Sequence, residues 1–133
     1  MAGRVVHFEL PADDLERARA FYAATFGWDI RSMPGMGYSL IRTTPTDERG
    51  VPTEPGAING GMLLRQAPIT APVITIRVAD IDAALRAVAS HGGAVVRGKL
   101  PVGPIGFAAY FRDPEGNVLG LWQDAGRQEP VRE

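Results

Sequence analysis

The sequence repeats itself at a distance of 66 residues, and this repeat constrains the fold more than any other feature. The aligned pairs are Asp14 and Asp80, Leu15 and Ile81, Ala18 and Ala84, and Gly27 and Gly93. Slightly further along the chain, Gly37–Tyr38 resembles Gly106–Phe107. Each copy predicts a strand, a helix and three more strands, and neither copy can bury its apolar face alone. We therefore expect an α+β fold of two tandem βαβββ modules. Their curved mixed sheets would surround a cup-shaped cavity, with the helices on the outside.

The first module is expected to span about residues 4–66. Strands are predicted at 5–10, 28–32, 38–43 and 57–64, where β-forming residues lie between turn signals. A helix capped by Asp13 or Asp14 should end at Gly27. Its apolar residues recur at a spacing of three to four and predict one buried face: Leu15, Ala18, Phe21, Tyr22 and Phe26.

Two further features of the first module concern its last strand and the segment before it. Residues 44–56 are polar and contain three prolines, which indicates a long surface loop that is either a lid over the cavity or an idle insertion. The pair Gly60–Gly61 indicates a β-bulge or a close approach of another group to the backbone.

The second module is expected to span about residues 71–124. Strands are predicted at 73–78, 94–97, 107–112 and 118–123, and a helix capped by Asp80 should end at His91–Gly93. Residues 113–117 have the composition of a type I turn between the last two strands. With the polar tail 125–133, the two modules make one domain of 133 residues.

Composition excludes several functions. The net charge of −1 gives no electrostatic basis for binding nucleic acid or an anionic membrane, and no apolar run approaches the length of a membrane span. The chain has no cysteine, so disulfides, thiolate catalysis and cysteine metal ligands are excluded. Together with the lack of a signal-peptide pattern, this fits a cytoplasmic protein.

Several short motifs, in this order, resemble the glyoxalase/bleomycin-resistance (vicinal oxygen chelate) superfamily. They are His7–Leu10, Asp13–Ala18 with Phe21–Tyr22, Phe26–Trp28, Val78–Ala84 and Asp113–Asn117. The resemblance covers residues 5–123. Residues 58–61 and 116–122 point to a branch related to lactoylglutathione lyase. The resemblance also implies a homodimer.

The resemblance implies a divalent-metal site built by four strands, and most of its ligand positions are lost here. The first position falls on His7, whereas the matching positions fall on Val73, on Gly120 and near Gly60–Met62, none of which supplies a metal ligand. We therefore expect no metal or other cofactor. If a divalent metal does bind, His7 and Glu9 are its expected ligands.

Strand alternation places His7 and Glu9 on the face opposite Val6, Phe8 and Leu10, and therefore toward the cavity. They are the candidate catalytic pair, as acid and base, and also candidate ligand-binding residues. The other candidate ligand-binding residues are Tyr38, Thr75, Phe107 and Trp122. For Trp122, packing in the core is slightly favoured over stacking on a ligand, and for Tyr38 and Phe107 the two interpretations are equally good.

Three functions stay open. The first is a metal-free protein that binds and sequesters a small organic compound. The second is a lyase or isomerase of the superfamily that uses His7 and Glu9, with or without a divalent metal. The third is an interaction module that uses the cavity surface as an interface.

Overall fold

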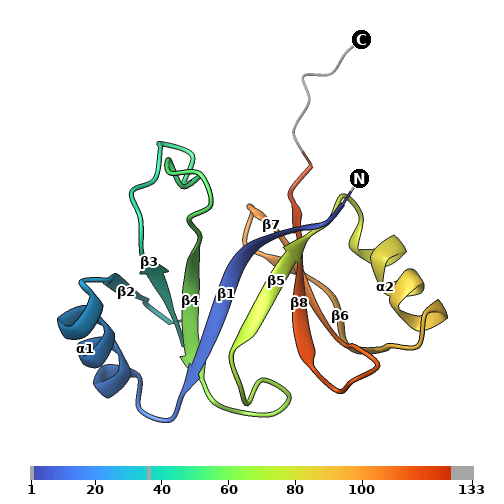
Figure 1. Cartoon of the computed structure of the whole chain (residues 1–133), viewed down its shortest axis with the longest axis horizontal. Coiled ribbons are helices and arrows are strands. Elements are labelled where there is room, and N and C mark those ends of the chain that lie inside the picture. Colours follow the sequence, from blue (N-terminus) through green and yellow to red (C-terminus); the bar gives the residue numbers. More distant parts are fainter. Residues whose placement is uncertain (1, 36, 127–133) are drawn as a thin grey trace. The chain divides into compact units, whose positions relative to one another are not determined.

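The computed structural model describes residues 2–35 and 37–126 and contains two βαβββ modules (Figure 1). The chain forms two compact units, Val6–Ile74 and the described residues outside that range. The α+β class and the repeated element order predicted from the sequence are confirmed. No helix of the described residues is long and apolar enough to cross a membrane.

The first module contains one helix and four strands. They are β1 (Arg4–Ala12), α1 (Leu15–Phe26), β2 (Asp29–Met33), β3 (Tyr38–Arg42) and β4 (Asn59–Leu64). The strands lie in the order β2-β3-β4-β1, in which β1 pairs with β4 in parallel and the other pairs are antiparallel. The sheet is therefore mixed, as expected.

The second module repeats this order with β5 (Val73–Arg77), α2 (Ile81–Ser90), β6 (Ala94–Val102), β7 (Gly106–Arg112) and β8 (Val118–Asp124). Its strands lie in the order β5-β8-β7-β6, and the β5–β8 pair is parallel. The second predicted strand of this module, at 94–97, continues to Val102 through two register shifts against β7. Pro101 is tolerated there because this outer strand has a neighbour on one side only.

Both helices begin and end as the sequence predicts. The carboxylates of Asp14 and Asp80 accept hydrogen bonds from the third residue of their helices, at 3.0 and 3.2 Å. The first helix ends at Gly27, whose φ of 73° suits a residue without a side chain.

Each helix covers one face of its own sheet (Figure 1). In the first module Ala12, Ile41 and Met62 are buried beneath α1, with Phe8 and Leu10 packed against them. In the second module α2 covers a corresponding core of Ile81, Leu85, Ala109 and Leu121. The predicted apolar face of α1 is correct for Leu15, Ala18 and Tyr22.

Phe21 and Phe26 do not join that buried face, since they are 55% and 60% exposed. They lie at the edge of an aromatic group in which Tyr22 stacks on Trp28 with ring centroids 5.0 Å apart. Arg19 of α1 is partly buried, and its Nη1 donates a hydrogen bond to the buried hydroxyl of Ser39, 3.3 Å away.

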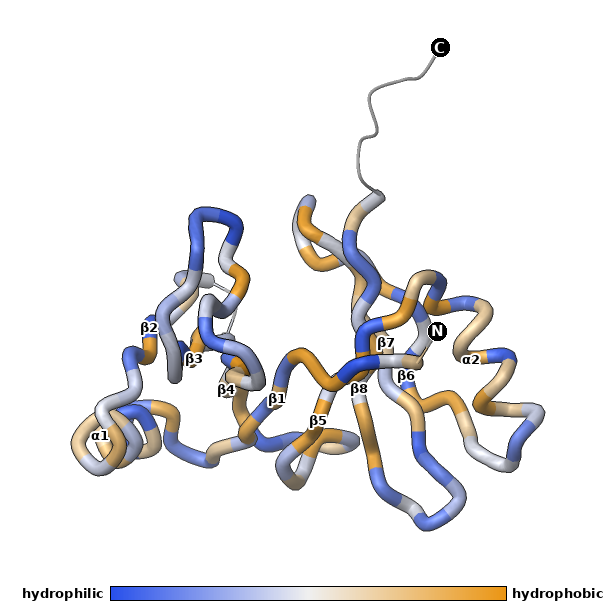
Figure 2. Tube along the Cα trace, turned by 45° about the horizontal axis from the view of Figure 1, so that its top comes forward, coloured by the Kyte–Doolittle hydropathy of each residue, from blue (hydrophilic) through white to orange (hydrophobic). Residues whose placement is uncertain are grey.

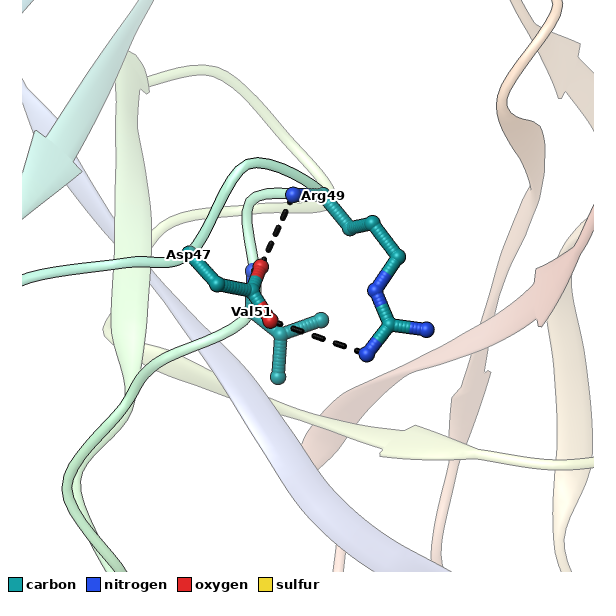
Figure 3. Close-up of polar contacts among 3 residues, drawn as sticks. All are labelled: Asp47, Arg49 and Val51. Carbon is teal, nitrogen blue, oxygen red and sulfur yellow. Dashed lines mark hydrogen bonds and ion pairs between the residues drawn. The ribbon is translucent and has the colours of Figure 1, made fainter.

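The segment 44–56 is a folded extension of the β3–β4 hairpin. Thr46 and Pro52 form an antiparallel bridge, and the amide of Thr53 donates to the carbonyl of Pro45 at 3.0 Å. At the tip the Asp47 carboxylate accepts from the amide of Arg49 at 2.8 Å and lies 3.7 Å from the Arg49 guanidinium (Figure 3). It also accepts from the amide of Val51 at 3.0 Å. The extension is mainly hydrophilic (Figure 2).

The tip of this extension is built like the β7–β8 turn, 66 residues later. Asp113 accepts from the amides of Glu115 and Asn117, both at 2.9 Å. Gly50 and Gly116 occupy the same place in the two turns, with φ of 82° and 89°. These backbone hydrogen bonds lower the pKa of Asp47, and hydrogen bonds led by the Asn117 side chain lower that of Asp113. The internal repeat therefore extends to the turn between the last two strands of each module.

Candidate functional site

The candidate site of the first module lies on the sheet face that α1 does not cover. His7 and Glu9 are on β1, opposite Asn59 and Gly61 of β4, and Tyr38 on β3 is opposite Leu63. Because Phe8 and Leu10 pack beneath α1, strand alternation directs His7 and Glu9 to the other face.

Tyr38 connects the two polar side chains of β1. Its hydroxyl donates a hydrogen bond to Glu9 Oε2 at 3.1 Å and lies 3.0 Å from His7 Nε2. Glu9 is buried, with 7% of its surface exposed, and His7 is partly buried. The structure thus brings together three of the predicted site residues in one hydrogen-bonded chain.

The surroundings of His7 in this hydrogen-bonded group favour a neutral imidazole. Burial lowers the pKa of His7 below its ordinary value, and the nearby Glu9 carboxylate raises it by a smaller amount. His7 is therefore uncharged at neutral pH, and a neutral imidazole can both donate and accept a hydrogen bond.

The glycine pair of β4 makes this arrangement sterically possible. A Cβ atom on Gly61 would overlap the ring and hydroxyl of Tyr38, and one on Gly60 would meet the Phe8 ring at 2.7 Å. The β1–β4 and β3–β4 registers run through both glycines without interruption, so no bulge is present. Of the two predictions for Gly60–Gly61, the close approach to the backbone is correct.

The second module carries Thr75 and Trp122 on the corresponding face of its own sheet. Thr75 is buried opposite Gly120, where an added Cβ atom would meet the Thr75 hydroxyl oxygen at 2.9 Å. The Trp122 ring lies over Gly106, and its Nε1 donates to Asp124 at 2.8 Å.

Asp124 was not identified as a site residue from the sequence, because it follows the last predicted strand. Its carboxylate also forms an exposed ion pair with Arg77 at 3.5 Å. The carboxylate thereby holds Trp122 and Arg77 of neighbouring strands together. The Trp–X–Asp spacing along β8, which places both side chains on one face, was the available signal.

Phe107 lies on the opposite face of its sheet, the face that α2 covers. It packs against the core of the second module, and Lys99 Nζ lies 4.6 Å above its ring. The sequence match of Tyr38 with Phe107 is wrong by one residue. Tyr38 and Ala108 occupy corresponding positions, since they pair with Leu63 and Trp122 in equivalent registers. A one-residue offset moves a side chain to the other face of a sheet.

The positions that the resemblance assigns to metal ligands do not form a metal site. Tyr38 fills the space where a side chain at position 61 would begin, Gly120 lies against Thr75, and Val73 is buried. Within residues 2–35 and 37–126, no three His, Cys, Asp or Glu side chains form a group that could hold a metal ion. The residues present therefore do not fit a divalent metal.

A separate hollow of about 370 Å³ lies where β1 meets α1. Tyr22 and Phe21 contribute apolar walls, and Arg65 at its edge is paired with Asp13 at 2.9 Å. None of the predicted site residues lines this hollow.

The chain is similar to known proteins over most of its length. Residues 4–44 match the family model described as bleomycin resistance protein-like N-terminal. A glyoxylase-like domain-containing protein of Didymella fabae is 31% identical over 130 residues, which cover 94% of this chain and 97% of that protein. The Mycobacterium bovis protein named "Putative glyoxylase CFP32" is 32% identical over 86% of this chain, which spans 43% of its length.

Solved structures share the fold at low sequence identity. Hypothetical protein BH1468 from Bacillus halodurans C-125 superposes with a TM-score of 0.63 at 13% identity, with full coverage of both chains. The methylmalonyl-CoA epimerase of Streptomyces coelicolor, in complex with 2-nitronate-propionyl-CoA, gives a TM-score of 0.64 at 19% identity. That match covers 98% of this chain and 100% of the epimerase.

Proposed function

Because this chain belongs to the glyoxalase/bleomycin-resistance (vicinal oxygen chelate) superfamily, we propose that it is a metal-free protein that binds a small organic molecule. The observation that carries the proposal is the position of the Tyr38 hydroxyl between His7 and Glu9, over Gly61. The hydroxyl occupies the space that a metal-binding side chain on β4 would need, and it forms a hydrogen bond with the Nε2 atom of His7. A polar site of this kind suits the functional groups of an organic molecule.

The surroundings of these polar groups indicate a ligand with apolar surface as well. Leu40, on the same face of β3, is 46% exposed, and the end of the Tyr38 ring occupies the space where a side chain at position 61 would begin. Binding sites for small molecules commonly combine apolar walls with a few fixed polar groups. We also propose Thr75 and Trp122 as ligand-binding residues of the second module.

Thermal unfolding with a panel of compounds tests binding directly. The panel consists of bleomycin and methylmalonyl-CoA, the compounds in the names of the matching family and of a structurally similar epimerase complex. A ligand present at about one hundred times its Kd adds about 2.7 kcal/mol to stability, so a true ligand gives a saturable rise in Tm. Tyr38→Phe should weaken that rise, and the absence of a saturable rise for every compound would count against the proposal.

A second candidate function is a lyase or isomerase that moves a proton of its substrate. The observation that favours it is the pairing of a buried carboxylate with a neutral imidazole through one hydroxyl. A base that is uncharged at neutral pH can accept a proton from a substrate. Product analysis of each panel compound distinguishes the two functions. An enzyme would lose turnover but keep binding on Glu9→Gln, whereas a binder would show no turnover in either form.

The proposal also includes a cytoplasmic homodimer. The outer strands β2 and β6 each have a neighbour on one side only, and such edges can pair with another chain. Light scattering of the purified protein at several concentrations tests the oligomeric state, and a constant monomer mass would remove this part of the proposal.

A further inference from the structure

The hydrogen bonds around Tyr38 determine which nitrogen of His7 carries the proton. A phenol hydroxyl has one proton, and Tyr38 donates it to Glu9 Oε2 at 3.1 Å. The Tyr38 oxygen can therefore act only as an acceptor toward His7 Nε2, 3.0 Å away. The Nε2 atom must then carry the hydrogen of a neutral imidazole.

We propose that Tyr38 fixes His7 in the Nε2–H form, so that Nδ1 is the acceptor which receives an O–H or N–H group of the ligand. Within residues 2–35 and 37–126, the hydroxyl of Tyr38 is the one hydrogen-bond partner of the His7 ring. An imidazole nitrogen with a lone pair binds hydrogen-bond donors and does not bind carbonyl or carboxylate oxygens. The ligand class is therefore a small molecule with an alcohol, phenol, amide or amine donor.

The chain contains a natural internal control for this inference. His91, the second of two histidines, ends α2 with its Nδ1 atom 2.8 Å from the carbonyl oxygen of Ala87. A carbonyl can only accept, so Nδ1 of a His91 ring in this contact must carry a hydrogen. The two histidines therefore have opposite requirements: hydrogen on Nε2 in His7 and on Nδ1 in His91.

Nuclear magnetic resonance of the ¹⁵N-labelled protein reads the two forms separately. Long-range ¹H–¹⁵N spectra near neutral pH should show His7 with a protonated Nε2 and an unprotonated Nδ1, and His91 with a protonated Nδ1. His91→Gln assigns the signals by removing one set. A protonated Nδ1 on His7, or a doubly protonated ring near neutral pH, would overturn the assignment.

Tyr38→Phe separates a positioning role from a merely structural one. Phenylalanine keeps the ring over Gly61 but removes the hydroxyl, so His7 loses the partner that selects its form. The two His7 nitrogen shifts should then move toward each other, as in a mixture of forms, while the His91 shifts stay constant. Unchanged His7 shifts in a folded Tyr38→Phe protein would show that Tyr38 does not select the form.

The ligand class rests on the proposed function, because it assumes that a small molecule reaches this sheet face. Phenol and anisole form a matched probe pair that differs in one donor hydrogen. Millimolar phenol should move the His7 Nδ1 resonance, and anisole should leave it in place. A response to both compounds or to neither would overturn the ligand class, while the proton position in the unliganded protein stands on its own spectrum.

Discussion

The hydroxyl of Tyr38 lies where a side chain on Gly61 would begin, and it donates a hydrogen bond to Glu9, which is two strands away in the sheet. Tyr38 lies on β3 and Gly61 on the neighbouring antiparallel strand β4. The tyrosine ring reaches across the glycine to the Glu9 carboxylate on β1, the strand on the other side of β4. One residue without a side chain therefore allows a strand β3 hydroxyl to contact two strand β1 side chains.

Gly61→Ala should destabilise the protein by about 1–3 kcal/mol, because the new methyl group overlaps Tyr38 and forces the ring to move. Urea unfolding measures the change. Gly98→Ala is the matched control, since nothing lies within 4 Å of a Cβ atom there. In a Tyr38→Ala background the cost of Gly61→Ala should fall; equal costs in both backgrounds would disprove the clash.

Tyr38→Phe should lower the free energy of unfolding by about 1–3 kcal/mol, because it removes the hydroxyl that donates a hydrogen bond to the buried Glu9 carboxylate. Chemical denaturation gives the value. Tyr22→Phe is the control, since the Tyr22 hydroxyl forms no hydrogen bond with the residues that the structure describes. Equal losses in the two variants would show that the Tyr38 hydroxyl contributes no more to the free energy of unfolding than the Tyr22 hydroxyl does.

The stability of the protein should fall on acidification below the ordinary His7 pKa of about 6.5. Burial lowers the pKa of His7 in the folded state, so the unfolded chain binds more protons in this window. The stabilising contribution is full above pH 6.5 and is lost as pH falls toward the folded-state pKa. Urea midpoints across this range should decline for the native chain and for His91→Gln, but less for His7→Gln. An identical decline in His7→Gln would assign the effect to another group.

Gly116→Ala should cost about 1 kcal/mol, because its φ of 89° is unfavourable for any residue with a side chain. Gly50→Ala introduces the same strain, at a φ of 82°, but at the tip of the hairpin extension. The Gly116 change should therefore lower the global unfolding free energy, and the Gly50 change should mainly increase local amide exchange around Asp47. Equal global losses would show that the extension unfolds together with the sheet.

Metal analysis should find well under one transition metal per chain, because Tyr38 and the glycines occupy the positions of the lost ligands. The measurement is mass spectrometry of untagged protein purified without chelators, repeated after incubation with Ni, Mn, Fe and Zn. His7→Ala and Glu9→Ala serve as controls for specific binding. About one metal per native chain, lost in both variants, would restore a metal site at His7 and Glu9.

The local sequence determined the elements and their order. The 66-residue repeat gave two βαβββ modules, and Asp14, Asp80 and Gly27 marked helix ends, because caps and turns depend on neighbours within a few residues. Alternation along β1 also indicated that His7 and Glu9 share one face of the strand. These features can be predicted without knowing which strands pair or in which register.

Strand register was decided only by the tertiary structure. The sequence aligned Tyr38 with Phe107, whereas pairing in the sheets aligns it with Ala108 and directs Phe107 toward α2. The spacing of apolar residues along α1 could not predict that Phe21 and Phe26 are exposed, since their exposure depends on where the sheet beneath α1 ends.

The sequence by itself thus determined the modules, their helix ends and the shared face of His7 and Glu9. The tertiary structure alone decided that Tyr38 joins them across Gly61 and that Asp124 holds Trp122. The physical reason is that periodicity and capping arise between neighbours in the chain, whereas register and diagonal contacts arise between strands whose separation along the sequence carries no local signal.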